Sequence, residues 1–242
     1  MHSPRLLPRL ASIVALITAG VCLYQADGLA EPVGSPSGIL RKGQWLLGLG
    51  SGGVFGRTVK ATAGGTSTDE SVYNIEHVRG YGLTDWLSLY GKIGWAYMAV
   101  SDAGVQNSFG SNLLLGGQVK ARIWHHPRWN CEWDGSLQYL WIGAPHQRGR
   151  NQGLWQEYQL ATSVAKSFGR FTPYIGAKAS LANFSYKLRK NGKITTIGQY
   201  KPRSTVGPFV GADYVVGEDL IVNIESAYIN GSELTVTVSR RL

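Results

Sequence analysis

The sequence predicts an all-β protein: a closed, up-and-down antiparallel transmembrane β-barrel of about ten strands. Three observations lead to this fold class. Ten runs alternate between apolar and polar residues, their connections are short and long in turn, and large aromatic side chains gather at the ends of the runs. The composition agrees, because 32 glycines, 11% aromatic residues and only 16% charged residues favour strands.

The N-terminal residues have the layout of an export signal. A basic start precedes an apolar run over residues 11–24, and small residues follow at Gly28 and Ala30. The run is too short for a spanning helix and is typical of a signal peptide. We therefore expect residues 1–30 to be removed after Ala30 and residues 31–242 to form one barrel domain. An uncleaved N-terminal anchor is the alternative.

Cysteine usage argues against a disulfide framework. Cleavage of the signal would leave only Cys131, and one thiol cannot close an internal bridge. Cys22 raises the alternative of a lipidated protein, but Val21 stands before it where a small residue is expected. The fold must therefore be stabilised by backbone hydrogen bonds and packing.

The ten runs have about the length of tilted membrane strands, which is roughly 9–11 residues. They cover residues 43–55, 71–82, 86–97, 112–124, 130–142, 154–166, 171–182, 204–216, 219–229 and 233–242. In lipid an open sheet edge would leave backbone groups unpaired, so the sheet must close. With both chain ends on one side the strand number is even, and a pair of strands merged or missed would give eight or twelve.

The connections alternate between short turns and long loops. The short ones are residues 83–85, 125–128, 167–170 and 217–218, and the longer, more polar ones are residues 56–70, 98–111, 143–153 and 183–203. Only the last connection, residues 230–232, breaks the rule. Outer-membrane barrels have short periplasmic turns and longer outer loops, whereas a soluble sandwich has no reason to sort its connections in this way.

Alternation places two kinds of side chain on opposite strand faces. The apolar face includes Leu87, Leu89, Ile93, Trp95, Leu115, Val119, Trp133, Leu137, Leu160, Ile175, Leu181, Ile224 and Val236. The polar face carries charges of both signs, which we predict to form a network in the lumen: Lys92, Lys120, Arg122, Glu132, Asp134, Glu157, Lys178, Asp213 and Glu225. A narrow barrel is filled by side chains and buried charges need partners, so the two signs should nearly balance.

The tryptophans favour a membrane barrel over a soluble sandwich with an apolar core. Five of them stand at or near the ends of the predicted strands: Trp86, Trp124, Trp129, Trp141 and Trp155. Tryptophan prefers the membrane–water boundary, where the ring is apolar and the N–H group stays hydrated. Core rings would gather in the middle of strands instead.

Three stretches resemble the small outer-membrane β-barrel superfamily, which includes the OmpA-like and OmpW-like porin families. They are Gly80–Gly94 (GYGLTDWLSLYGKIG), Phe171–Ala177 (FTPYIGA) and Val210–Tyr228 (VGADYVVGEDLIVNIESAY). The resemblance implies the barrel architecture and assembly by the outer-membrane machinery. Such barrels end in a strand closed by Phe, whereas this chain ends at Leu242. Either the machinery reads this ending, or the strand stops at Val238 before a basic tail.

A basic cluster in the last long loop is the most suggestive surface feature. It consists of Lys187, Arg189, Lys190 and Lys193. Facing outward, these residues would contact the phosphates of lipopolysaccharide. The alternative is a solvated hairpin turn around Asn191–Gly192, a sequence typical of tight turns.

The histidines give no motif for a metal or a cofactor, and we expect neither. His125 and His126 stand in a predicted turn beside Pro127. His77 lies in the middle of a predicted strand, where an inward ring would pair with a carboxylate such as Glu225. His146 lies in an outer loop. Spacing alone supplies no base and orienting group for catalysis.

These features lead to three functional hypotheses. The first is a porin-like barrel, structural or forming a narrow or gated pore with side chains filling the lumen. The second is a surface recognition protein acting through loops 56–70 and 183–203. The third is a lipid-modifying enzyme using His77 or His146. The net charge of +9 fits anionic lipid, and export argues against nucleic acid as a partner. Solute and oligomeric state are left open.

Overall fold

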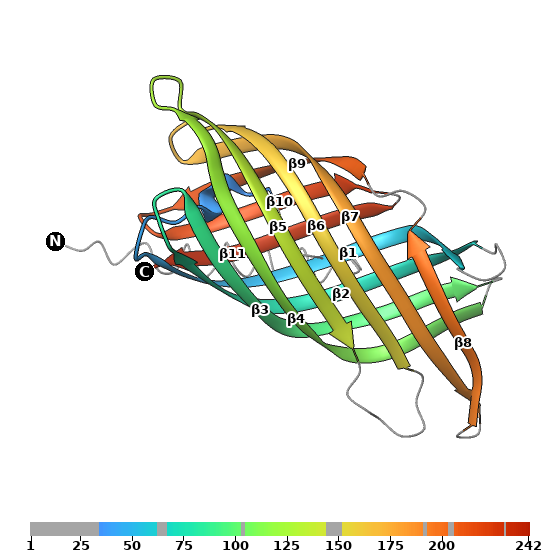
Figure 1. Cartoon of the computed structure of the whole chain (residues 1–242). Coiled ribbons are helices and arrows are strands. Elements are labelled where there is room, and N and C mark those ends of the chain that lie inside the picture. Colours follow the sequence, from blue (N-terminus) through green and yellow to red (C-terminus); the bar gives the residue numbers. More distant parts are fainter. Residues whose placement is uncertain are drawn as a thin grey trace.

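The chain forms a closed antiparallel β-barrel, seen in the computed structural model of Figure 1. The structure describes residues 34–61, 67–102, 105–143, 152–190, 193–202, 206–229 and 231–242. The strands in this part are β1 (Trp45–Ala61), β2 (Ser67–Gly82), β3 (Leu87–Asp102), β4 (Val105–His126), β5 (Cys131–Gly143), β6 (Gln152–Lys166), β7 (Phe171–Lys190), β8 (Lys193–Pro202), β9 (Val206–Val216), β10 (Leu220–Tyr228) and β11 (Ser232–Arg241).

Ten of these strands form the wall predicted from the sequence. β1 to β7 pair in chain order, β9 follows β7, and β10 and β11 lead back to β1. The closing pair of β1 and β11 runs from Leu46 opposite Arg241 to Phe55 opposite Ser232. The predicted fold class is therefore confirmed. β11 continues through Arg240 and Arg241, so the alternative ending at Val238 is wrong.

The strands are longer than predicted at the end with the long loops. β1 extends to Ala61 and β2 begins at Ser67, so most of the predicted loop 56–70 is strand. Likewise β3 and β4 leave only residues 103–104 between them. The alternation of the sequence continues into these segments, but their polar composition made them read as loops.

The predicted loop 183–203 is wrong, because it contains the end of β7 and the whole of β8. β8 returns along β7, pairing Tyr200 with Phe184, and its end pairs with β1 through Pro202 opposite Val59. β8 thus bridges β7 and β1 beyond the ends of β9, β10 and β11. The wall narrows from ten strands at the short-turn end to the ring β1–β8 at the long-loop end.

The outward side chains form an apolar surface, which we call the belt. Trp95 is 67% exposed, Leu181 63% and Leu160 61%, and the residues predicted for the apolar face point outward throughout the described strands. Trp86, Trp124 and Trp129 are exposed beside the short turns, as the interface prediction requires. Trp155 contradicts it: this ring is 2% exposed and lies inside the barrel. Parity, rather than nearness to a loop, decides where a ring points.

Helical structure is confined to one short segment of the described chain. It is the 3-10 helix η1 (Pro36–Gly38), which precedes β1. No described helix is long and apolar enough to cross a membrane.

Candidate functional site

The segment Gly34–Leu40, which we call the plug, lies inside the barrel at the short-turn end. All its residues except Ser37 are buried. Ser35 Oγ donates to Asp213 Oδ1 at 2.9 Å, and the backbone N–H of Ser37 donates to Asp213 Oδ2 at 2.9 Å. The N–H of Gly34 donates to Glu225 Oε2 at 2.9 Å. Two inward carboxylates therefore satisfy the donors of a peptide that forms no strand.

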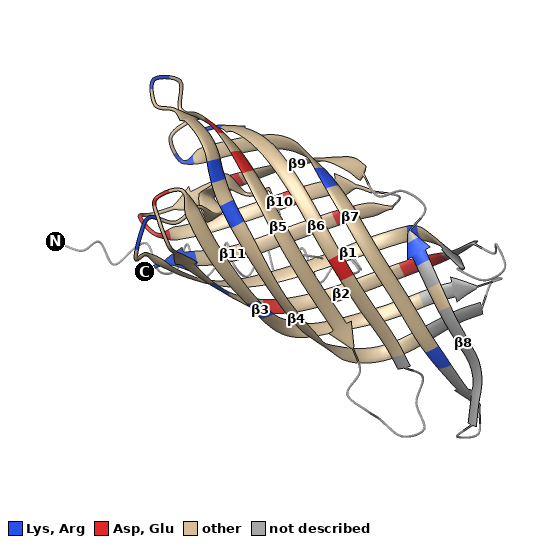
Figure 2. Cartoon of the chain, in the orientation of Figure 1, with Lys and Arg blue, Asp and Glu red and all other residues tan. Residues whose placement is uncertain are grey.

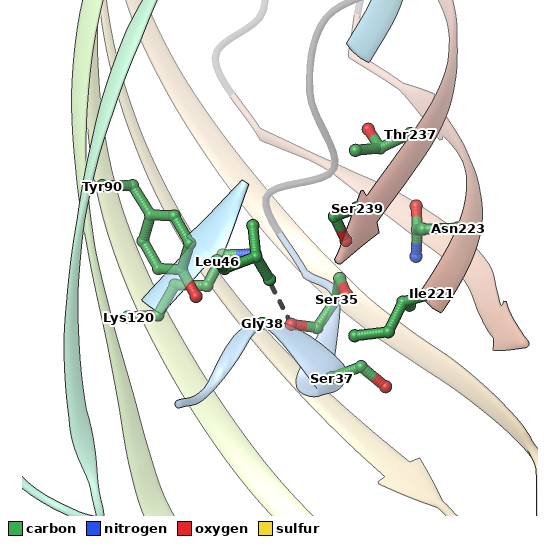
Figure 3. A pocket seen from close by; sticks show the side chains of 10 residues that line it. All are labelled: Ser35, Ser37, Gly38, Leu46, Tyr90, Lys120, Ile221, Asn223, Thr237 and Ser239. Atoms are coloured by element: carbon green, nitrogen blue, oxygen red, sulfur yellow. Dashed lines mark hydrogen bonds between the residues drawn. The ribbon is translucent and has the colours of Figure 1, made fainter. Parts of the chain in front are cut away.

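Three carbonyl groups of the plug face donors from strands of the wall. Ser163 Oγ donates to the carbonyl of Gly34 at 2.9 Å, and an Arg241 guanidinium N–H donates to the carbonyl of Ser37 at 2.9 Å. Lys120 Nζ lies 3.5 Å from the carbonyl oxygen of Ser35, the contact drawn in Figure 3. The adjoining cavity holds about 20 Å³, enough for about one water molecule. The plug thus fills this end of the lumen.

A chain of hydrogen bonds and ion pairs crosses the middle of the lumen. Arg57 donates to Glu157 at 3.1 Å and pairs with Glu233. Lys178 pairs with Glu233 and lies 4.0 Å from Glu225. All five side chains are at most 3% exposed as residues, so each charge depends on these partners.

This network is continuous with the contacts that hold the plug. Glu225, which accepts from the plug, also accepts from the Tyr174 hydroxyl at 3.0 Å. Asn223 Nδ2 donates to that hydroxyl at 2.9 Å and to Asp213, the other carboxylate that binds the plug. The plug is therefore part of the same hydrogen-bonded unit as Arg57.

A second branch leads from Glu157 along the inside of the wall toward β3. Gln159 Nε2 donates to Glu157 at 3.0 Å, Gln138 Nε2 donates to Gln159 at 3.3 Å, and Lys92 donates to Gln138. Lys92 thus reaches the network through two buried amides. Neutral amides on β5 and β6 carry the contact between charges on β3 and β6.

The structure places the predicted network residues in two regions, the buried lumen and the short-turn end of the barrel. Lys92, Lys120, Asp134, Glu157, Lys178, Asp213 and Glu225 are buried in the lumen. Arg122 and Glu132 pair at 3.1 Å near the short turns, where the Arg122 side chain is 31% exposed. The side chains at the start of β5 thus point to both sides of the wall: Trp133 and Leu137 point outward, while Asp134 points inward.

The expected balance of charge is not found among the described residues. Their buried charged side chains comprise four basic residues, Arg57, Lys92, Lys120 and Lys178, and seven acidic residues, Glu70, Glu76, Asp134, Glu157, Asp213, Glu225 and Glu233. Both carboxylate oxygens of Glu70 and of Asp134 lack a hydrogen-bond partner among the described residues. More acidic than basic side chains are therefore buried in the lumen.

Sequence reasoning missed four of these buried charges. Arg57 and Glu70 were assigned to the loop 56–70, and Glu233 begins the last strand. Glu76 lies in the predicted strand 71–82 but is absent from the predicted network. The signal was available for Glu70, because Glu70, Val72 and Asn74 alternate with outward residues. For Arg57 the alternation is hidden by Gly56, because its φ of 57° marks a bulge that shifts the parity of β1.

The long-loop end of the lumen is closed by an apolar cluster, which we call the neck. Its residues are Val59, Val72, Ala96, Met98, Phe109, Leu114, Leu140, Ile142, Trp155, Ala182, Phe184 and Tyr186. The adjoining cavity holds about 20 Å³. An eight-stranded ring is just wide enough for side chains to fill, so narrowing by β8 explains the tight packing.

Trp155 joins the neck to the charged network. Its indole N–H donates to Glu157 Oε2 at 3.0 Å, and the Arg57 guanidinium lies 5.4 Å from the ring centroid. A ring and a cation at this distance attract each other. Neck, network and plug therefore form one connected interior.

The histidines do not form the sites considered for them. His77 points outward and accepts from Arg79 Nε at 3.1 Å, so an inward pair with Glu225 is wrong. His126 belongs to the end of β4 rather than to a turn, and its ring stacks on Trp129 with centroids 4.5 Å apart. His146 lies outside the described residues. Within the described part of the chain, no group of three ligands could hold a metal ion.

The basic cluster lies on the β7–β8 hairpin rather than in a loop. Lys187, Arg189 and Lys190 belong to the end of β7, and Lys193 begins β8 opposite Lys190. The hairpin prediction at Asn191–Gly192 is consistent with this pairing, although those two residues lie outside the described part. The Lys187 side chain is exposed, whereas those of Arg189, Lys190 and Lys193 are not described.

No protein-family model and no curated protein sequence matches the chain. Several solved structures match the chain at low sequence identity. An outer membrane channel from Pseudomonas putida F1 is 14% identical with a TM-score of 0.41, covering 84% of this chain and 97% of that one. Ail, the attachment invasion locus protein of Yersinia pestis, is 8% identical with a TM-score of 0.39, and the match covers 83% of this chain and 99% of that one. The translocator domain of the autotransporter NalP from Neisseria meningitidis is 9% identical with a TM-score of 0.41, and the match covers 85% of this chain and 90% of that one.

Proposed function

We propose that the protein is an outer-membrane β-barrel whose narrow pore is closed at rest by two gates in series, the plug and the neck. The observation that carries this proposal is the plug itself, buried in the lumen and held by Asp213 and Glu225. A short peptide held by a few hydrogen bonds can leave the lumen without unfolding the wall. The plug is therefore suited to act as a gate.

The belt supports a place in the membrane. Large apolar side chains cover the outward face of the strands, and exposed tryptophans stand beside the short turns. Acyl chains would cover the belt, and the indole rings would lie at the interface. By the rule for outer-membrane barrels the short turns face the periplasm, so the plug closes the periplasmic end. The assembly machinery would read the last strand, β11, through an ending at Leu242.

The neck supplies the second gate. Its apolar side chains leave a cavity of about 20 Å³, and a constriction of this kind excludes water and ions by dewetting. Met98, Phe109 and Phe184 belong to three different strands. Rotation of these side chains would widen the ring without breaking its backbone pairing.

The network between the gates provides a physical coupling. When the plug leaves, Glu225 loses the Gly34 N–H donor and must find another. Lys178 lies 4.0 Å from Glu225, and Lys178 also holds Glu233, the partner of Arg57. Arg57 in turn contacts Trp155 in the neck. Opening at one end thus changes the electrostatic environment of the other.

Conductance in planar bilayers tests the two gates. We would compare the intact chain with a deletion of residues 34–39, with the pair Trp155→Ala and Phe184→Ala, and with all changes combined. The intact chain and each single-gate variant should stay mostly closed, and the combined variant should conduct steadily. Trp133→Ala with Leu137→Ala, which truncates two outward side chains, is the matched control.

Two results would overturn the proposal. One is steady conductance by the intact chain, which would mean that plug and neck do not close it. The other is a combined variant that carries no current although it folds, as shown by heat-modifiable migration in gels.

A second candidate function is recognition at the cell surface. The β7–β8 hairpin projects beyond the ends of β9, β10 and β11 and carries the exposed Lys187 (Figure 1). A projecting basic hairpin offers a contact for anionic molecules outside the cell.

A further inference from the structure

A polar groove of about 190 Å³ lies at the junction of β6, β7 and β8. It is lined by Leu154, Gln156, Asn183, Phe184, Ser185, Gln199 and Lys201. Gln156 stands opposite Asn183 across the β6–β7 pair, and Ser185 stands opposite Gln199 across the β7–β8 pair. Three neighbouring strands therefore present amide and hydroxyl groups side by side.

The groove opens on the outside of the barrel, away from the lumen. Strand parity fixes this, since Trp155 and Phe184 point inward and their neighbours Gln156 and Asn183 point outward. The neck lies on the other side of this part of the wall. A ligand can therefore enter the groove from outside the barrel without passing through the plugged lumen.

The groove begins where the belt ends. On β6 the outward residues Leu160 and Tyr158 are 61% and 53% exposed, and the next outward residue is Gln156. On β7 the exposed Leu181 is followed in the same way by Asn183. Gln156 stands opposite Asn183, so the first polar outward residues beyond these apolar ones lie at the same level on both strands, as expected where acyl chains give way to headgroups.

The charge of the groove favours an anion. Lys201 is exposed and lines the groove, Lys187 is exposed further along the same face of β7, and none of the lining residues is acidic. In Figure 2 blue positions mark β7 and β8 in this region. A lysine ammonium binds phosphate as a point charge, and the amides and the hydroxyl can bind sugar hydroxyl groups.

We propose that this groove binds the phosphorylated sugar headgroup of an outer-leaflet glycolipid, with the acyl chains lying along Tyr158, Leu160 and Leu181. Pockets for drug-sized ligands start at about 300 Å³, so the groove takes one sugar-phosphate unit and leaves the rest of the headgroup in solvent. The inference rests on the proposed function in one respect, the outward orientation of the long-loop end.

Lipid binding to the full chain in detergent tests the inference. The probes are lipopolysaccharide, the same material after phosphate removal, and phosphatidylglycerol. We expect Lys201→Gln, which loses one charge-assisted hydrogen bond, and, separately, Asn183→Ala with Gln156→Ala, which loses two neutral hydrogen bonds, each to weaken lipopolysaccharide binding about tenfold. Lys166→Gln, which removes an exposed lysine beside a short turn, should leave it unchanged.

Three other outcomes would each contradict the inference. Equal binding by the groove variants and the intact chain would show that the headgroup lies elsewhere. Equal binding after phosphate removal would exclude the role of Lys201. A parallel loss of phosphatidylglycerol binding would reduce the groove to a general anionic contact. Heat-modifiable migration and conductance of the same preparations test the barrel and its gates separately, so failure of the inference is distinguishable from failure of the proposed function.

Discussion

At the scale of single residues, Arg57 makes the interactions on which the lumen most depends. It is 1% exposed and holds both Glu157 and Glu233. Arg57→Met keeps the volume but leaves Glu157 without the cation that it contacts and Glu233 with Lys178 alone. Breaking a buried pair from one side costs about 3–5 kcal/mol, so we expect a loss of this size in the free energy of unfolding. Urea unfolding of the barrel in lipid vesicles measures it.

The control for Arg57 is an arginine outside the lumen. Arg128 is exposed in the turn between β4 and β5, and Arg128→Met should change the free energy of unfolding by less than about 0.5 kcal/mol. Equal effects of the two substitutions would mean that Arg57 contributes no more than a surface charge.

At the scale of elements, Gly56 sets the course of β1. Its φ of 57° suits glycine, and no heavy atom lies within 4 Å of an added Cβ. Gly56→Ala therefore tests backbone strain alone, and we expect a loss of about 1–2 kcal/mol in the free energy of unfolding. Gly91→Ala, also in open space but without a positive φ, should be neutral or slightly stabilising. Equal unfolding midpoints for the two variants would contradict a role for the bulge.

The same bulge shows how far the sequence predicts the elements. Strand number, strand order and the two faces follow from period-two alternation, because each wall residue meets either lipid or lumen. Alternation cannot reveal β8, whose pairing with β1 joins residues distant in sequence. Nor can it reveal the plug, because Gly34–Leu40 is held by single hydrogen bonds to side chains of distant strands. The predicted network could be found by parity only where no bulge shifted the register.

At the scale of the whole molecule, charge is sorted between the lumen and the outside. The full chain has a net charge of +9, yet the described buried side chains include seven acidic and only four basic residues, an excess of three acidic residues. Rings of carboxylates select cations in narrow pores. We therefore expect the variant with both gates removed to be cation-selective, despite the basic exterior.

The reversal potential in a potassium chloride gradient measures this selectivity. It should move toward the potassium equilibrium potential in the gate-free variant. Adding Glu70→Gln and Asp134→Asn should lower the potassium-to-chloride permeability ratio several-fold, because water fills the opened lumen and ionises these two carboxyl groups there, so the substitutions remove two negative charges. Neither carboxylate has a hydrogen-bond partner among the described residues, so these substitutions remove charge with little loss of structure. Glu218→Gln, in an exposed turn, is the matched control and should leave the ratio unchanged. Anion selectivity would show that the net charge of the chain, rather than the lining of the lumen, governs permeation.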